Sequence, residues 1–124
     1  DPLDNSEDEL DNLLGHADIV SLHMPLLPET KLFFNQKKLS LLKDGALLIN
    51  TSRGPIIDED ALYNELIKGR IYSAIDVFWQ EPYQGKLTNS NVKNIYLTPH
   101  VASNCKEFLE GIANDFLDFH NILI

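Results

Sequence analysis

The sequence predicts an α/β fold: a partial, Rossmann-like, doubly wound parallel sheet that ends in a long helix. Four short apolar runs rich in β-branched residues, at 17–24, 46–51, 71–78 and 92–98, are expected to form buried strands. The segments between them carry helix-capping signals. Strands that alternate with helices favour a parallel sheet with right-handed crossovers.

The helices are predicted from their caps and from apolar periodicity. Ser6 opens a capping box for a helix that should stop near Gly15, while Asn35 and Asp58 are expected to cap the next two helices. The segment from 104 to about 121 repeats large apolar side chains at a period of about 3.6, which predicts a long amphipathic helix. These side chains are Phe108, Ile112, Phe116 and Phe119.

Composition and charge restrict the possible classes of protein. The 124 residues are 44% hydrophobic and 23% charged, which is ordinary globular usage. The net charge of −9 argues against nucleic acid or an anionic membrane as a partner. No apolar run approaches the roughly 20 residues that span a bilayer. The single cysteine, Cys105, fits a reducing cytoplasm, and the first residue is Asp1 rather than Met, so we expect a piece of a longer protein.

Three segments place a reactive side chain where an expected strand stops: a guanidinium at Arg53, a carboxylate at Glu81 and an imidazole at His100. In parallel α/β sheets, ligands bind at the carboxyl ends of the strands. A guanidinium can hold a carboxylate through two hydrogen bonds, and an imidazole can donate or accept a proton near neutral pH. Alternatively, Arg53 is an ordinary surface arginine after a strand, and Glu81 is a turn residue before Pro82.

Six motifs in order resemble the D-isomer-specific 2-hydroxyacid dehydrogenases that use NAD. They are Asp1-Pro2, His23-Met24-Pro25-Leu26 with Thr30, Lys43-Asp44-Gly45-Ala46, Asn50-Thr51-Ser52-Arg53-Gly54, Asp76-Val77-Phe78-Trp79-Gln80-Glu81-Pro82 and Thr98-Pro99-His100. The family's glycine fingerprint for the dinucleotide, G-x-G-x-x-G, does not occur in the sequence. Residues 1–103 therefore resemble the C-terminal portion of the dinucleotide-binding domain. Residues 104–124 resemble the long helix that leads towards the substrate domain, which is absent here.

The resemblance implies roles for individual residues. Arg53 would bind the substrate carboxylate, His100 would exchange a proton with the substrate oxygen, and Glu81 would hydrogen-bond the far nitrogen of His100. Asp76 would accept a hydrogen bond from the nicotinamide carboxamide. Asp1 would bind the ribose hydroxyls, which favours NAD over NADP. Further residues expected to line the cofactor are Met24, Pro25, Thr30, Thr51, Ser52 and Arg53.

The function implied by the resemblance is hydride transfer between NAD(H) and a D-2-hydroxy acid/2-oxo acid pair, by a homodimer when the protein is full length. An alternative is an NAD-sensing, corepressor-like interaction module without turnover. The identity of the acid is left open, because the missing domain builds most of its pocket. The isolated piece is expected neither to bind NAD tightly nor to turn over. The four histidines are not spaced like metal ligands, so no metal is expected.

Other notable side chains receive structural interpretations. Glu59 and Glu65, on the helix after Asp58, are expected to be solvated. Cys105 is expected to be a packed, inert thiol. Trp79 could either shape the substrate pocket or pack in the core.

Overall fold

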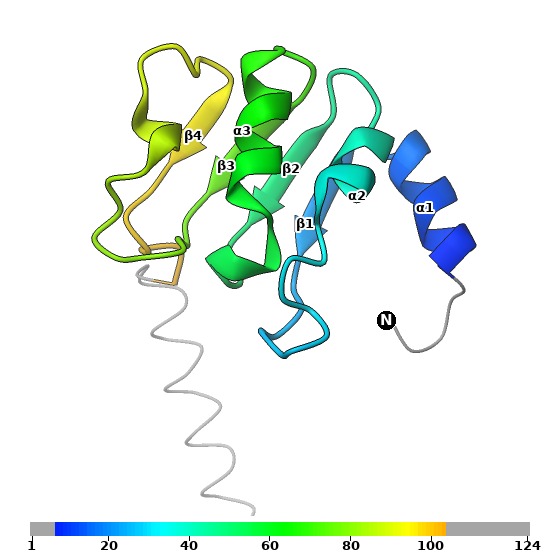
Figure 1. Ribbon diagram of the computed structural model, residues 1–124, viewed down its shortest axis with the longest axis horizontal. Helices are drawn as coiled ribbons and strands as arrows, with labels where there is room; N and C mark the ends of the chain where they lie inside the picture. The colour runs from blue at the N-terminus through cyan, green and yellow to red at the C-terminus, as the bar shows by residue number, and fades with distance from the viewer. Residues whose placement is uncertain (1–6, 104–124) are drawn as a thin grey trace, which may run out of the picture.

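The computed structural model describes residues 7–103, and these residues form a parallel four-stranded sheet in the order β1-β2-β3-β4 (Figure 1). The strands are β1 (Ile19–Leu22), β2 (Leu47–Asn50), β3 (Tyr72–Ile75) and β4 (Ile95–Leu97). Each lies inside one of the four apolar runs, and all three pairings are parallel. The prediction of a parallel α/β sheet is confirmed.

Three helices pack beside one another on one face of this sheet (Figure 1). They are α1 (Glu7–His16), α2 (Gln36–Leu41) and α3 (Glu59–Ile67), with single 3-10 turns at η1 (Gly54–Ile56) and η2 (Lys86–Thr88). The chain crosses from each strand to the next in the same direction. Because such crossovers are right-handed, their helices fall on the same side of the sheet.

The described residues therefore form a singly wound half of the expected fold. A doubly wound sheet needs a point where the strand order reverses, with helices on both faces. No such reversal occurs between β1 and β4. The long helix expected over 104–124 lies outside the described residues, as do Asp1 and Ser6.

The predicted caps of α2 and α3 are confirmed. The Asn35 side chain accepts a hydrogen bond from the amide of Lys38, and the Asp58 carboxylate accepts from two amides in the first turn of α3. Just beyond α3, Gly69 adopts a φ of +69°, which glycine tolerates better than residues with a Cβ. These local signals fix where each helix begins and ends, and so where the strands can form.

The sheet buries one face and leaves the other open. Leu48 and Ile75 point into the core beneath the helices and are fully buried. On the opposite face Ile19, Tyr72 and Tyr96 are 61%, 54% and 70% exposed. We call this surface the bare face. It comprises Ile19, Ser21, Leu47, Ile49, Tyr72, Ala74 and Tyr96.

The expectation that Glu65 is solvated is wrong, because its side chain is only 2% exposed. Its carboxylate accepts hydrogen bonds from Gln36 (2.8 Å), Lys68 (2.9 Å) and Arg70 (2.5 Å). Arg70 also donates to carbonyls at the end of α2, one of them that of Leu39 at 2.6 Å. Glu65 and Arg70 thus join α3 to the C-terminus of α2.

Candidate functional site

Arg53 is positioned by a turn directly after β2. The side-chain amide of Asn50, which is fully buried, donates to the Arg53 carbonyl at 2.9 Å, and its oxygen accepts from the Ser52 amide at 3.0 Å. Asparagine is well suited to such a turn because its side chain can bond the backbone two or three residues on. The exposed guanidinium of Arg53 consequently lies at the carboxyl end of the sheet, where it donates to the Ser52 carbonyl at 2.6 Å.

Gly54 allows the loop after β3 to approach the Arg53 turn. A Cβ at this position would lie 2.2 Å from the carbonyl carbon of Phe78 and 2.6 Å from the amide nitrogen of Trp79. Only a residue without a side chain fits such an approach. The glycine therefore brings the Arg53 segment against the segment that carries Glu81.

Arg53 lines a hollow of about 460 Å³ at the ends of β1 and β2. Four of the residues expected to line the cofactor meet there: Met24, Pro25, Ser52 and Arg53. The Ser52 hydroxyl donates to the Met24 carbonyl at 2.7 Å, which ties the two loops together. The structure thus joins residues from two separate motifs in one concave surface.

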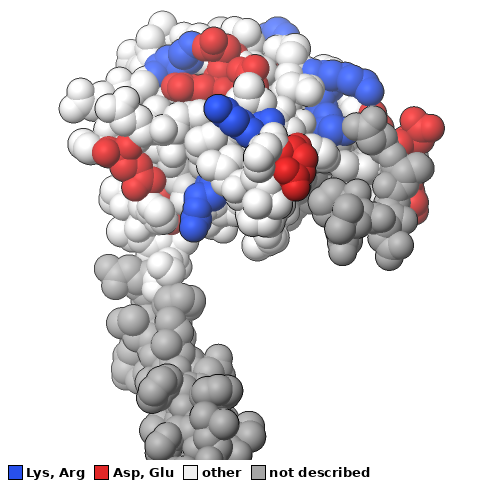
Figure 2. Space-filling model, turned by 60° about the horizontal axis from the view of Figure 1, so that its bottom comes forward, with Lys and Arg blue, Asp and Glu red and all other residues white. Residues whose placement is uncertain are grey.

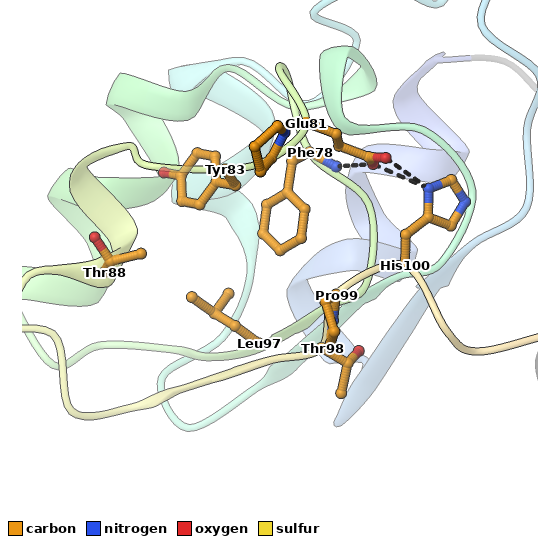
Figure 3. Close-up of a pocket in the computed structure, with 9 residues that line it drawn as sticks. Phe78, Glu81, Tyr83, Thr88, Leu97, Thr98, Pro99 and His100 are labelled. Carbon is orange, nitrogen blue, oxygen red and sulfur yellow. Dashed lines mark hydrogen bonds and ion pairs between the residues drawn. The ribbon is translucent and has the colours of Figure 1, made fainter.

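Glu81 and His100 form a hydrogen-bonded pair at the ends of β3 and β4 (Figure 3). The Nδ1 atom of His100 lies 3.0 Å from both carboxylate oxygens of Glu81. This bond holds the pKa of Glu81 below its usual value, against a smaller opposing effect of desolvation. The other ring nitrogen of His100 points away from Glu81 (Figure 3). A histidine held in this way can exchange a proton at its free nitrogen.

Asp76 holds the turn that carries His100. Its buried carboxylate accepts from the Thr98 hydroxyl at 2.5 Å and from the amides of Val101 at 2.8 Å and Ala102 at 2.9 Å. Burial alone would raise the pKa of Asp76, but these donors and the charge of His100 lower it. His100 itself has a φ of +55°, a left-handed conformation that is uncommon outside glycine. The Asp76 bonds on both sides of His100 stabilise it.

A second hollow, of about 380 Å³, borders the Glu81–His100 pair (Figure 3). Its walls are largely apolar and include Phe78, Tyr83 and Leu97. It shares no lining residue with the Arg53 hollow. The structure therefore brings Glu81 and His100 together and places Arg53 at the same edge of the sheet, but in a separate hollow.

The remaining expected cofactor residues lie in different settings. Thr30 is buried, and its hydroxyl donates to the Pro25 carbonyl at 2.6 Å and accepts from the Leu27 amide at 2.7 Å, so it braces its own loop. Thr51 is exposed immediately after β2. Asp1 lies outside the described residues.

Two residues with structural contacts beside the site were given no role from the sequence. Asn50 was available as a signal, because a polar side chain at the end of an apolar strand needs a partner once it is buried. Tyr83 gave no such signal, since its partners come from distant parts of the chain. Its hydroxyl donates to Glu59 at 2.6 Å, which makes Glu59 half-buried rather than solvated.

The surface around the site does not indicate a different class of ligand. Seen towards the carboxyl ends of the strands, acidic and basic side chains are interspersed with uncharged ones (Figure 2). Among residues 7–103, no group of three or more His, Cys, Asp or Glu side chains is placed to hold a metal ion. Within the same range, no helix has the length and apolarity needed to cross a membrane.

Comparison with known proteins identifies the family. The family described as D-isomer specific 2-hydroxyacid dehydrogenase, NAD binding domain, matches residues 2–102. The chain belongs to this family. Among its dehydrogenase relatives, the glyoxylate reductase of Thermococcus litoralis is 42% identical over 106 residues, which are 85% of this chain and 32% of that protein.

Solved structures of D-2-hydroxyacid dehydrogenases have the same fold as this chain. The D-lactate dehydrogenase of Aquifex aeolicus, complexed with NAD and lactic acid, superimposes with a TM-score of 0.70 at 33% identity, over 96% of this chain and 43% of that one. A D-isomer specific 2-hydroxyacid dehydrogenase of Xanthobacter autotrophicus Py2, in complex with NADPH and MES, gives a TM-score of 0.70 at 37% identity, over 77% and 40%.

The described residues thus belong to the NAD(P)-binding domain that is typical of the D-2-hydroxyacid dehydrogenase family. The chain spans less than half of the length of the relatives that it matches. The match begins at residue 2, and the motifs at Arg53, Glu81 and His100 all fall inside it.

Proposed function

We propose that this chain is the catalytic-side portion of an NAD-dependent D-2-hydroxyacid dehydrogenase that interconverts a D-2-hydroxy acid and the corresponding 2-oxo acid. The observation that carries the proposal is the contact of His100 Nδ1 with both oxygens of Glu81 at the carboxyl edge of a parallel sheet. In the whole protein, strands preceding β1 and helices on the bare face would complete a doubly wound sheet, and residues 104–124 would form the long helix towards the substrate domain.

The residues would divide the reaction as follows. A nicotinamide cofactor bound at this edge would supply the hydride in one direction and receive it in the other. His100 would give the proton from its free ring nitrogen to the substrate oxygen and take it back in reverse. Glu81, whose pKa is lowered by the bond to His100, would as a carboxylate hold the proton on Nδ1 and stabilise the charged ring. Arg53 would bind the substrate carboxylate and polarise the neighbouring carbonyl.

Arg53 and His100 must act on one substrate, although they line separate hollows. Gly54 already brings the Arg53 segment into contact, at Phe78 and Trp79, with the segment that carries Glu81, the partner of His100. We infer that the hollows open to each other when the substrate domain is in place. A closed cleft of this kind would exclude water and orient the acid between the two side chains.

The residues present fit the nicotinamide half of the cofactor. Met24, Pro25 and Ser52 form a concave surface at strand ends. Asp76 lines neither this hollow nor the one beside His100, and its buried carboxylate bonds the turn that carries His100. Asp76 accepts three hydrogen bonds, and a carboxylate can accept about four, so one position remains for a carboxamide donor. The glycine fingerprint for the pyrophosphate does not occur. Calorimetry of the 124-residue chain should therefore detect no micromolar affinity for NADH, and such affinity would contradict this proposal.

Catalysis can be tested in a chimera. Residues 7–103 would replace the matching segment of the Thermococcus litoralis glyoxylate reductase, which would supply the other parts of the protein. Reduction of 2-oxo acids with NADH should then be detectable. It should fall by at least about a hundredfold for His100→Gln and for Arg53→Gln, because general acid catalysis alone typically contributes that much. Lys37→Gln, an exposed change on α2, serves as the matched control.

The outcome distinguishes this function from its alternative. A chimera that binds NADH but reduces none of a panel of 2-oxo acids would favour the NAD-sensing interaction module. A second chimera that carries residues 1–103, assayed with NADH and with NADPH, would test the preference for NAD that Asp1 implies. We further propose that the whole protein is a cytoplasmic homodimer, and light scattering of the purified whole protein would check the dimer.

A further inference from the structure

The loop between β3 and η2 carries Glu81 but contains no regular secondary structure. The Glu81 and His100 side chains are 43% and 48% exposed, and an exposed ion pair alone contributes too little to order such a loop. Glu81 has one further partner in the loop, because the Phe78 amide donates to its Oε1 atom at 3.3 Å. The conformation of the Phe78 segment therefore decides where the Glu81 carboxylate lies.

Tyr83 fixes this loop from the side opposite His100 (Figure 3). Its ring stacks on Phe78 with a centroid distance of 4.6 Å and an interplanar angle of 16°. Its hydroxyl donates to Glu59 at 2.6 Å and accepts from the Leu87 amide at 3.1 Å. One side chain thus joins the start of α3, the start of η2 and the aromatic residue whose amide contacts Glu81.

Two features of the surroundings are consistent with a Tyr83 side chain that is held in one position. The Tyr83 hydroxyl donates to Glu59, and burial together with this bond raises the pKa of Tyr83 well above its usual range. A Cβ on Gly85 would lie 2.4 Å from the Tyr83 ring, so the glycine lets the ring lie flat against the chain. The ring also separates the apolar hollow beside His100 from a more polar hollow beside Glu59.

We propose that Tyr83 is a positioning residue for the catalytic pair: its hydroxyl bond to Glu59 and its stacking on Phe78 hold Glu81 in register with His100. This inference rests on the proposed function, in which Glu81 orients the ring of His100. The contact between the loop and α3, from Tyr83 to Glu59, would thus shape the site although it lies away from any reacting atom. Tyr83 acts on the reaction only through Glu81.

The test is nitrogen NMR of the His100 ring in the full 124-residue chain, which reports which ring nitrogen carries the proton. Glu81→Ala defines the signals of a ring without its partner. Tyr83→Phe removes only the hydroxyl and should move the His100 signals towards those of Glu81→Ala. Amide exchange at Phe78 should become about fivefold faster, the factor expected for one net hydrogen bond. Glu59→Gln, which keeps an acceptor oxygen, should resemble the parent chain more closely than Glu59→Ala.

Tyr96→Phe is the matched control, because it removes a tyrosine hydroxyl from the bare face, away from the hollow. It should leave both the His100 signals and the Phe78 exchange unchanged. Tyr83→Phe that lowers resistance to urea but leaves both readouts at parent values would overturn the proposal, because Tyr83 would then only pack. If Glu81→Ala itself fails to alter the His100 signals, the pair behind the proposed function is wrong instead.

Discussion

The side-chain amide of Asn50 donates to the backbone carbonyl of Arg53 across 2.9 Å, and this bond sets the direction of the only arginine at the described carboxyl edge. Asn50 has no solvent exposure, so both ends of its amide depend on the turn for partners. The turn and the arginine form one unit. Asn50, the last residue of β2, determines the geometry of this turn; the Arg53 side chain does not.

Replacement of Asn50 by Leu should lower the free energy of unfolding by about 1–3 kcal/mol, because the Ser52 amide and the Arg53 carbonyl lose their buried partner. Urea unfolding followed by circular dichroism measures the change. Asn64→Ala, on the exposed side of α3, should stay within about 0.5 kcal/mol of the parent chain. Equal effects of the two substitutions would show that the turn contributes nothing to stability.

Replacement of Gly54 by Ala should be severely destabilising, by about 3 kcal/mol or more, because the new Cβ would meet the Phe78 carbonyl carbon at 2.2 Å. Gly15→Ala is the matched change. It lies in α1, where the nearest atom to a Cβ is 3.7 Å away, and it should stabilise the chain by about 0.5–1 kcal/mol. Thermal unfolding of both variants measures the two changes in stability. If only Gly54→Ala lowers the melting temperature, the cause is the lack of space at Gly54 and not alanine in general.

Glu65 should give the chain part of its sensitivity to acid. Burial would raise its pKa, but bonds from Lys68, Arg70 and Gln36 lower it from 4.5 to about 2. A depressed carboxyl pKa stabilises the fold above its unfolded value and loses that contribution as the pH falls towards the folded value. The free energy of unfolding should therefore drop by about 3 kcal/mol between pH 5 and pH 2 through this group.

The variant Glu65→Gln checks that assignment. It should be less stable at pH 7 and should lack this part of the acid-induced loss, so that the difference from the parent chain shrinks as the pH falls. Glu29→Gln, at an exposed position, should follow the parent curve throughout. A constant difference between Glu65→Gln and the parent would mean that folding does not lower the pKa of Glu65.

The Glu81 carboxyl should titrate below its usual pKa, since the His100 bond favours its charged form. Any stabilisation from this pair is present above the unfolded pKa of Glu81 and is lost as the pH falls through the lowered value. Carbon NMR of the carboxyl group measures the titration directly. His100→Ala should return the pKa of Glu81 towards the ordinary value, whereas His16→Ala, at the end of α1, should not change it.

The elements of this fold were predictable because their signals are local. Asn35 and Asp58 each cap a helix through their own neighbours, and apolar runs between capped helices leave little choice but strands. The direction of the strands followed from their alternation with helices. The doubly wound arrangement was predicted as well, but residues 7–103 carry helices on one face of the sheet only (Figure 1).

The details of the site were harder to predict from the sequence, because they depend on contacts between residues that are far apart in the chain. Glu65 was expected in solvent because the sequence does not show that Arg70 folds back beneath α2. The pairing of Glu81 with His100 came from recognising motifs, and the structure adds the distances. The separation of Arg53 from that pair is tertiary, set by where two loops leave the sheet. No sequence period encodes it.

The bare face has a practical consequence for any study of the piece by itself. Three large apolar or aromatic side chains, Ile19, Tyr72 and Tyr96, are exposed to solvent on a pleated surface. Such a surface favours association with another copy of the chain. The charge of −9 opposes such contact at low ionic strength, and added salt screens that repulsion. Samples should therefore become turbid as salt and concentration rise together. Lysine at positions 72 and 96 should keep them clear.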